Sequence, residues 1–224
     1  KNRPDRMSYL EHSRYRGFDG VVLACIDFGD PEVIELVQSS IPVVTIDYLF
    51  NNRIAIMSDN VAGMKELLEY IYSRGHRKIA YIHGAMSAVT SGRLSSFYRT
   101  AERLGLDIPD EYIREAAYRD TTTTYRVTNE LLDLPNPPTC IIYPDDFASF
   151  GGINAIRQRG LQIPEDISVA GYDGIQAARQ LEPRLTTVQQ DTEQIGCLAA
   201  RELISLLERP KTTIIEQVIV PGKV

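Results

Sequence analysis

The chain has 224 residues, of which 43% are hydrophobic and 24% are charged, a composition typical of a globular protein with a packed core. Its formal net charge of -6 argues against direct binding of nucleic acid, because proteins that neutralise phosphates usually carry a basic surface. No apolar run approaches the roughly 20 residues that a membrane-spanning helix needs. We therefore expect a soluble protein that does not bind DNA by itself.

Short apolar and β-branched runs alternate with helical patterns along almost the whole chain. This alternation is typical of an α/β fold in which helices cover both faces of a parallel sheet. In chain order we predict strands, each apolar enough to be buried on both faces, at 19–26, 42–47, 54–57, 78–83, 113–118, 139–143, 167–171, 185–188 and 214–220. So many alternations in a chain of this length favour two doubly wound lobes over one sheet.

Helix signals lie between several of these strands. Acidic residues that can accept hydrogen bonds from free N–H groups precede three helical patterns, which we predict after Asp59, after Asp145 or Asp146, and after Asp191. These patterns end near residues 71, 159 and 208, where glycine or proline follows. Two of the helices thus begin with acidic residues at the end of a predicted strand.

Cys25, Cys140 and Cys197 are widely and irregularly spaced within apolar segments. An odd number of cysteines in such a pattern favours reduced, buried thiols in a cytoplasmic protein over a disulfide framework. The three histidines share no helical spacing with one another or with a pair of cysteines, so the known zinc patterns are not met. We expect a cytoplasmic location and no metal site.

Eight motifs follow one another along the chain. They are GFDGVVL at 17–23, IPVVTID at 41–47, SDN at 58–60, GHRKIAYI at 75–82, Arg93 with Phe97, DDFASFG at 145–151, IPEDISVAGYD at 163–173 and LTTV at 185–188. In this order and spacing they resemble the effector-binding core of LacI/GalR transcriptional regulators. The resemblance implies a periplasmic-binding-protein-like fold of type I, with two lobes joined by three crossovers. The first lobe (N-subdomain) would be 1–74 plus 190–213, and the second (C-subdomain) would be 75–189 plus 214–224.

The match begins late in the family pattern. The family has a strand, a helix and a second strand before the helix expected at 3–15, and a helix-turn-helix DNA-binding headpiece before those. We therefore expect the N-terminal part of the first lobe to be missing from this chain and the headpiece to be absent.

The resemblance implies that a small polar effector, such as a sugar, binds in a cleft between the lobes. The family places a ligand-binding arginine where Arg93 stands, after Ser87 at the expected start of a helix, where N–H groups and a guanidinium can bind ligand oxygens. We expect Arg93 and Ser87 to bind the ligand, and Arg93 to contribute little to core packing. The alternative is a surface arginine in a weak ion pair.

Asp145 and Asp173 end two predicted strands, at the sheet edge where open α/β folds bind ligands. The family usually has Asn where Asp145 stands, and a carboxylate there can accept two hydroxyl protons from a sugar, which suggests a hydroxyl-rich, non-anionic ligand. The alternatives are that Asp145 caps the following helix and that Asp173 bonds its own backbone beside Gly174. Gly174 stands where the family often has a second Asp.

Gln190 and Asp59 match family positions that sometimes contact the ligand. Hinge hydrogen bonding for Gln190 and helix capping for Asp59 are the alternatives. Phe147 and Tyr172 could stack on a sugar ring, although isolated aromatic residues near strand ends more often belong to the core.

Three functions compete. The chain lacks the phosphate-binding and nucleophile-elbow motifs, and no histidine lies beside a plausible nucleophile, so we expect neither an enzyme nor a cofactor. A periplasmic sugar-binding protein of a transporter would share the fold. The free cysteines and the stretch 163–187 favour a cytoplasmic repressor. Such a protein would be a homodimer that contacts operator DNA only through the absent headpiece and has no contact with a membrane.

Overall fold

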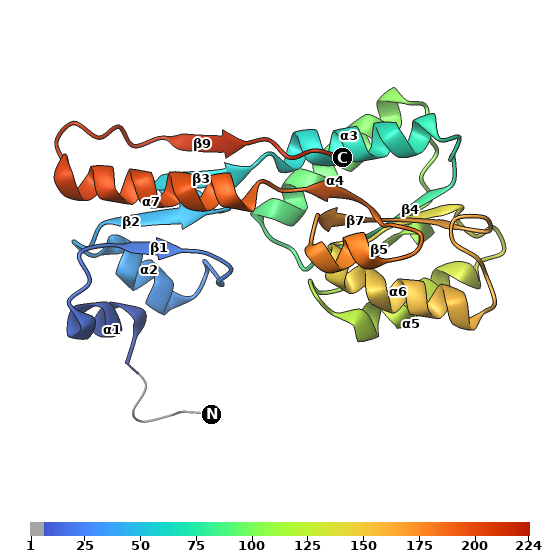
Figure 1. Cartoon of the computed structure of the whole chain (residues 1–224), viewed down its shortest axis with the longest axis horizontal. Coiled ribbons are helices and arrows are strands. Elements are labelled where there is room, and N and C mark those ends of the chain that lie inside the picture. Colours follow the sequence, from blue (N-terminus) through green and yellow to red (C-terminus); the bar gives the residue numbers. More distant parts are fainter. Residues whose placement is uncertain (1–6) are drawn as a thin grey trace. The chain divides into compact units, whose positions relative to one another are not determined.

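The computed structural model describes residues 7–224. It contains two parallel β-sheets, each covered by helices on both faces (Figure 1). Contacts along the chain define unit 1, which contains Lys1–Ser58 and Asp191–Val220, and unit 2, which contains Asp59–Gln190 and Pro221–Val224. The chain therefore passes between the units three times. The α/β class with two doubly wound sheets and three crossovers is confirmed.

Unit 1 is built on a four-stranded parallel sheet in the order β1-β2-β3-β9. The strands are β1 (Val21–Leu23), β2 (Val43–Ile46), β3 (Ile54–Ser58) and β9 (Gln217–Val220), and the helices are α1 (Tyr9–Arg16), α2 (Pro31–Gln38) and α7 (Thr192–Glu208). Leu23 and Val43 face α1 and α2, whereas Val44 and Ile56 face α7. Successive residues of a strand point to opposite faces, so α7 and the α1–α2 pair lie on opposite sides of the sheet (Figure 1).

Unit 2 is built on a five-stranded parallel sheet in the order β5-β4-β6-β7-β8. Its strands are β4 (Ile79–His83), β5 (Ile113–Glu115), β6 (Cys140–Ile142), β7 (Ser168–Asp173) and β8 (Thr186–Gln189). Its helices are α3 (Asn60–Ser73), α4 (Ala88–Arg103), α5 (Thr121–Leu132) and α6 (Asp146–Gln158), with short 3₁₀ turns η1 (Asp110–Tyr112) and η2 (Gln176–Gln180).

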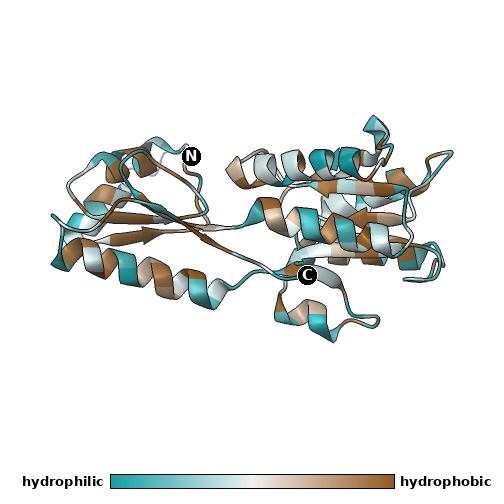
Figure 2. Ribbon diagram, turned by 90° about the horizontal axis from the view of Figure 1, so that it is seen from above, coloured by the Kyte–Doolittle hydropathy of each residue, from teal (hydrophilic) through white to brown (hydrophobic). Residues whose placement is uncertain are grey.

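The core of unit 2 has two layers, one on each side of its sheet. Ile79 and Tyr81 of β4 pack with α3 and α4, whereas Ala80 and Ile82 pack with α5 and α6. Figure 2 shows the same pattern in colour, because hydrophobic strands are flanked by helices that alternate between hydrophobic and hydrophilic residues. The sheet is therefore covered on both faces.

All nine predicted strands are present, and the three predicted helices begin after Asp59, Asp145 and Asp191, each of which accepts a hydrogen bond from a backbone N–H in the first turn. Of the helix expected at 3–15, residues 9–15 belong to α1, and residues 3–6 lie outside the described residues. Helices α2 and α5 were not among the predicted elements.

The units differ from the expected lobes in two segments. Residues 59–74 were expected in the first lobe, but α3 packs against α4 and the unit 2 core. Residues 214–220 were expected in the second lobe, but β9 pairs in parallel with β3 of unit 1. In both cases the hydrophobic contact or the strand pairing decides to which unit the segment belongs.

Two expectations about burial are wrong. β9 is an edge strand whose residue Ile219 is 56% exposed, because only one side of the strand is paired and no helix covers this residue. Cys140 is buried at the start of β6, as expected, but Cys25 and Cys197 are exposed. Within residues 7–224, no helix is long and apolar enough to cross a membrane.

Candidate functional site

The predicted site residues all lie in unit 2, and most of them follow the carboxyl ends of its strands. Strands β4, β6, β7 and β8 are parallel and neighbours in the sheet, so their carboxyl ends meet at one edge. Ser87 follows β4, Asp145 follows β6, Asp173 ends β7 and Gln190 follows β8. The observed topology places the strand ends that carry Asp145 and Asp173 at one sheet edge, as expected, and adds the segments that carry Ser87 and Gln190.

Arg93 lies in α4 and is only 3% exposed. Its Nε donates a hydrogen bond to Asn60 Oδ1 at 2.8 Å, and its Nη1 donates to the backbone oxygen of Pro144 at 3.0 Å. The guanidinium carbon lies 3.4 Å from the centre of the Tyr172 ring, a cation–π arrangement, and 6.0 Å from the centre of the Tyr118 ring. Arg93 is therefore a core side chain as well as a candidate ligand-binding residue, and the expectation that it contributes little to packing is wrong.

The remaining terminal nitrogen of Arg93, Nη2, faces the carboxylate of Asp173. Nη2 lies 4.0 Å from Asp173 Oδ1, too far for a hydrogen bond. Among the described residues, Nη2 makes no hydrogen bond. Because the ring beneath and the two bonds on the other nitrogens fix the guanidinium plane, this edge of the group is held in place and can donate to a ligand oxygen.

Asp173 and Gln190 join the ends of β7 and β8. Gln190 Nε2 donates to Asp173 Oδ1 at 2.5 Å, and the Gln190 backbone N–H donates to the Asp173 backbone oxygen at 3.2 Å. Asp173 has φ 109, a left-handed conformation that turns its carboxylate at the strand end. Partial burial raises the pKa of Asp173 to about 6, while the charge of Arg93 and the hydrogen bond from Gln190 act in the opposite direction.

Gly174 follows Asp173 at φ 72. A Cβ atom at this position would lie 2.6 Å from the Cα of Gln189, which is closer than real Cβ atoms approach backbone. The Asp that the family often has here would not fit this turn without a shift of β8. The glycine is thus a consequence of how closely the ends of β7 and β8 approach.

Asp145 is buried and has both of its carboxylate oxygens occupied. Oδ1 accepts a hydrogen bond from Ala148 N at 2.7 Å and so caps α6, and Oδ2 accepts one from Arg119 N at 2.7 Å. The loop that follows β5 is therefore bound, through Arg119, to the end of β6. The structure shows the capping role of Asp145, and the bond from Arg119 was not predicted. A carboxylate with two such bonds still has lone pairs for a ligand hydroxyl.

Asp146, the alternative cap of α6, has a different role. It is fully buried, and its carboxylate accepts hydrogen bonds from Thr187 Oγ1 at 2.6 Å and from Ile175 N at 2.8 Å. Burial raises the pKa of Asp146 above its ordinary value, although both hydrogen bonds favour the charged form. Its contacts run to β8 and to the loop after β7, so it connects the elements that carry Asp173.

Ser87 and Asp59 act as helix caps in this structure. Ser87 Oγ accepts from Thr90 N at 3.1 Å at the start of α4, and Asp59 Oδ1 accepts from Ala62 N at 2.8 Å at the start of α3. No hydrogen bond between described residues joins either of them to Arg93. Their ligand contacts remain predictions.

The two aromatic candidates differ. Tyr172 is 1% exposed and lies beneath the Arg93 guanidinium, so it is not a free stacking surface for a sugar. Phe147 is 47% exposed on α6 and contacts Phe150 with a distance of 5.7 Å between ring centres. Asn60 and Tyr118, which contact Arg93, were not predicted, although Asn60 belongs to the SDN motif. The described residues contain no cluster of three or more His, Cys, Asp or Glu side chains that could hold a metal ion.

The sheets and this polar edge define the class of periplasmic-binding-protein-like sensor domains. The family model described as "Periplasmic binding protein-like domain" matches residues 68–224, and the chain belongs to this family. Within it, the resemblance to LacI-family regulators is confirmed by the relatives that the chain matches.

Three relatives illustrate the match. The chain is 33% identical over 199 residues to the probable HTH-type transcriptional repressor ExuR of Bacillus subtilis, covering 87% of this chain and 60% of that protein. It is 27% identical over 208 residues to the HTH-type transcriptional repressor PurR of Escherichia coli, covering 91% and 61%. The crystal structure of a regulatory protein of the LacI family from Chloroflexus aggregans matches with a TM-score of 0.82 at 28% identity, covering 94% and 76%. The chain thus spans about 60% of the length of these curated relatives.

Proposed function

We propose that this chain is the effector-sensing part of a bacterial transcriptional repressor and that it binds a small, uncharged, hydroxyl-rich molecule of the sugar class. The effector binds at the carboxyl edge of the unit 2 sheet and changes the affinity of a helix-turn-helix headpiece, part of the longer protein, for operator DNA. The curated relatives, which are themselves named as HTH-type repressors, support this function over a transport receptor or an enzyme.

The observation that carries the proposal is the fixed guanidinium of Arg93 beside Asp173. Nη2 supplies donors for a ligand oxygen, and the Asp173 carboxylate, half-buried at the strand end, supplies acceptors for ligand hydroxyls. A ligand with neighbouring hydroxyl groups satisfies both kinds of partner at once. A purely apolar ligand would leave both unpaired, which is costly at a desolvated site.

The charges at this edge favour an uncharged ligand. The carboxylates of Asp145, Asp146 and Asp173 lie at this edge, where the charges of Asp145 and Asp146 act on Asp173, and Arg93 Nη2 is 4.0 Å from Asp173 Oδ1. A sugar phosphate would add negative charge beside these carboxylates. We therefore expect a neutral sugar to bind more tightly than its phosphate ester.

The test is a thermal-shift screen of neutral sugars, sugar phosphates and purines, followed by isothermal titration calorimetry with the best ligand. A ligand that binds only the folded state raises the melting temperature. Arg93→Lys keeps the charge but loses the planar fork, and it should weaken binding about tenfold or more. Arg99→Lys, an exposed residue on the same helix, is the control and should bind as the parent does.

Two results would reject the proposal. Preferential binding of a sugar phosphate or a purine would show that the charge argument is wrong. Unchanged sugar affinity in Arg93→Lys would place the ligand elsewhere. In the longer protein, the identified sugar should also change the affinity for DNA from upstream of its own gene in a band-shift assay, since an effector shifts an equilibrium only by its differential affinity for the two states.

We also propose that the protein is a homodimer, because a two-fold protein matches a palindromic operator. The exposed Phe147, next to the half-buried Phe150 on α6, offers an apolar surface for this contact. Sedimentation equilibrium of the longer protein should give the mass of a dimer, and Phe147→Glu should shift the equilibrium toward the monomer. A parent protein that is monomeric at high micromolar concentration would contradict this proposal.

A further inference from the structure

A cavity of about 340 Å³ lies in unit 2, at the amino ends of the strands. Cys140, Ser168 and Thr186, the first residues of β6, β7 and β8, lie in its wall. The last turn of α3, residues Ile153 and Arg157 of α6, and the loop before β8 complete the lining.

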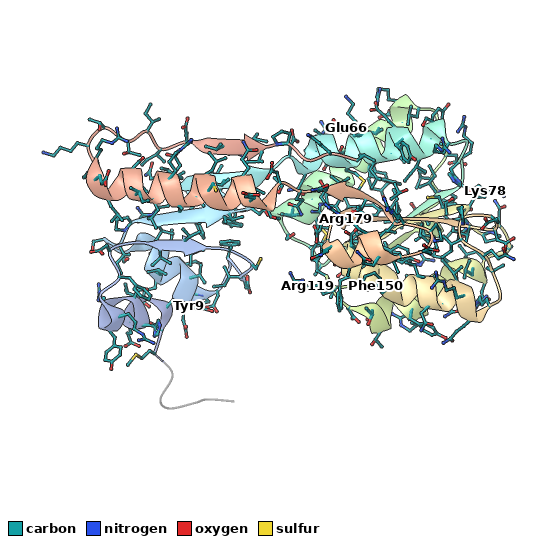
Figure 3. All side chains as sticks on the ribbon, in the orientation of Figure 1. Tyr9, Glu66, Lys78, Arg119, Phe150 and Arg179 are labelled. Atoms are coloured by element: carbon teal, nitrogen blue, oxygen red, sulfur yellow. The ribbon has the colours of Figure 1, made fainter. Side chains whose placement is uncertain are left out.

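This cavity and the candidate effector site lie at opposite edges of the same sheet. Strand β7 begins at Ser168 in the cavity wall and ends at Asp173 in the candidate site, five residue steps or about 16 Å away. Figure 3 labels Lys78 and Arg119 at opposite ends of unit 2. Lys78 accepts a backbone bond from Thr139, which precedes β6, and Arg119 donates to Asp145. The cavity is thus a separate place and not an extension of the site described above.

The charged residues that line the cavity are all cationic. Arg74, Arg157 and Arg184 lie in its wall, and among the described residues no Asp or Glu does, although the exposed Glu182 belongs to the same loop as Arg184. Nη2 of Arg157 donates to the backbone oxygen of Glu182 at 2.8 Å and holds the loop 181–184 against α6. Within residues 7–224, the side chains of Arg74 and Arg184 make no hydrogen bond or ion pair. Two guanidinium groups without partners give this cavity a positive rim.

His76 also lines the cavity and shares a hydrogen bond of 2.9 Å with Thr139 through Nδ1. Burial lowers the pKa of His76 and so favours its neutral form, and the arginines supply the positive charge. The inner wall is apolar and is formed by residues of α3, α6 and β7 and by the residue before β8: Ile71, Ile153, Val169, Ala170 and Leu185. The cavity therefore presents a hydrophobic interior next to a cationic rim.

We propose that this cavity binds a small organic anion. Its apolar body, of about the size of one aromatic ring, packs against Ile71, Ile153 and Leu185, and its carboxylate or phosphate group is bound by Arg74 and Arg184. Arginine suits this task because its planar fork donates two parallel hydrogen bonds to a carboxylate or phosphate. The exposed rim keeps the charge partly screened, so we expect weak, readily reversible binding.

The experiment uses benzoate and phenyl phosphate as probes, with benzyl alcohol as a neutral molecule of similar shape. Methyl NMR of the full chain follows Ile71 and Ile153 at the cavity and Ile175 at the opposite edge. Both anions should shift the signals of Ile71 and Ile153 and leave Ile175 unchanged. Relative preference for benzoate or phenyl phosphate then distinguishes a carboxylate ligand from a phosphate ligand.

Matched variants test the role of the arginines. Arg74→Gln and Arg184→Gln should each weaken probe binding about three- to tenfold. Arg126→Gln removes the same charge from an exposed residue on α5, which pairs with Glu130 outside the cavity, and should leave binding unchanged. Equal binding of benzyl alcohol, an equal loss in Arg126→Gln, or no methyl shifts up to about 10 mM probe would overturn the proposal. None of these outcomes depends on whether a sugar binds at the other edge.

Discussion

Replacing Arg93 with alanine should destabilise the fold of unit 2, in addition to any loss of ligand binding. A cation–π contact shielded from water contributes up to about 2 kcal/mol, and Arg93 is stacked on buried Tyr172. The substitution also leaves Asn60 Oδ1 and Pro144 O without a charged donor, at about 1 kcal/mol or more for each acceptor. Removal of a buried charge offsets part of this loss. We expect the free energy of unfolding to fall by about 2–4 kcal/mol.

Urea denaturation followed by circular dichroism measures this change, and hydrogen exchange of peptides from α4 and β7 assigns it to unit 2. Arg99→Ala is the matched control, because Arg99 is exposed on the same helix and donates only to Ser95 O at 3.3 Å. Its effect should stay within about 0.5 kcal/mol. If Arg93→Ala is as stable as Arg99→Ala, then the stacked guanidinium does not support the core and our reading of the site is mistaken.

Three further predictions concern the strand ends and the surface charge. The pKa of Asp173 is raised to about 6 in the folded state, so ionisation of this carboxyl lowers stability as the pH rises above about 4. Between about pH 5 and 7.5, the free energy of unfolding of the parent should fall by about 1 kcal/mol more than that of Asp173→Asn, as measured by urea denaturation. Gly174→Ala should lower the melting temperature clearly more than Gly160→Ala, since both have positive φ but only at Gly174 would the Cβ meet backbone; equal effects would contradict the close approach of β7 and β8. The chain by itself, with a net charge of -6, should show no sequence-specific binding to duplex DNA at physiological salt in fluorescence anisotropy, and a specific complex would disprove this.

The strands were predictable from the sequence because each is a short apolar run followed by a polar or glycine-containing break. The assignment of segments to units was harder, since it depends on long-range pairing that no local pattern contains. β9 is apolar like the buried strands, yet it pairs only with β3 at the edge of unit 1, and its residue Ile219 is exposed. Apolar composition indicates a strand but does not distinguish a central position from an edge.

The candidate site was predictable as a set of positions but not as a set of contacts. The parallel topology brings the residues after β4, β6, β7 and β8 to one edge, so the position of a residue after a predicted strand indicates that it belongs to the site. The burial of Arg93 depends on Tyr172 and Asn60, which come from different elements. The bond from Arg119 to Asp145 likewise joins two loops. Such contacts follow from tertiary packing and have no signature in the spacing of residues.

Because the chain crosses between its two units three times, the units cannot complete their folds in simple chain order during synthesis. Unit 2 is almost one continuous segment, 59–190, and lacks only the short stretch 221–224, where Lys223 bridges to Gln189. Unit 1 cannot complete its fold until α7 and β9 have been synthesised, and these elements follow the whole of segment 59–190 in the chain. Domains generally fold as units while the ribosome delivers them. On the nascent chain, most of unit 2, including Arg93 and Asp173, can therefore assemble while β3 still has an unpaired edge.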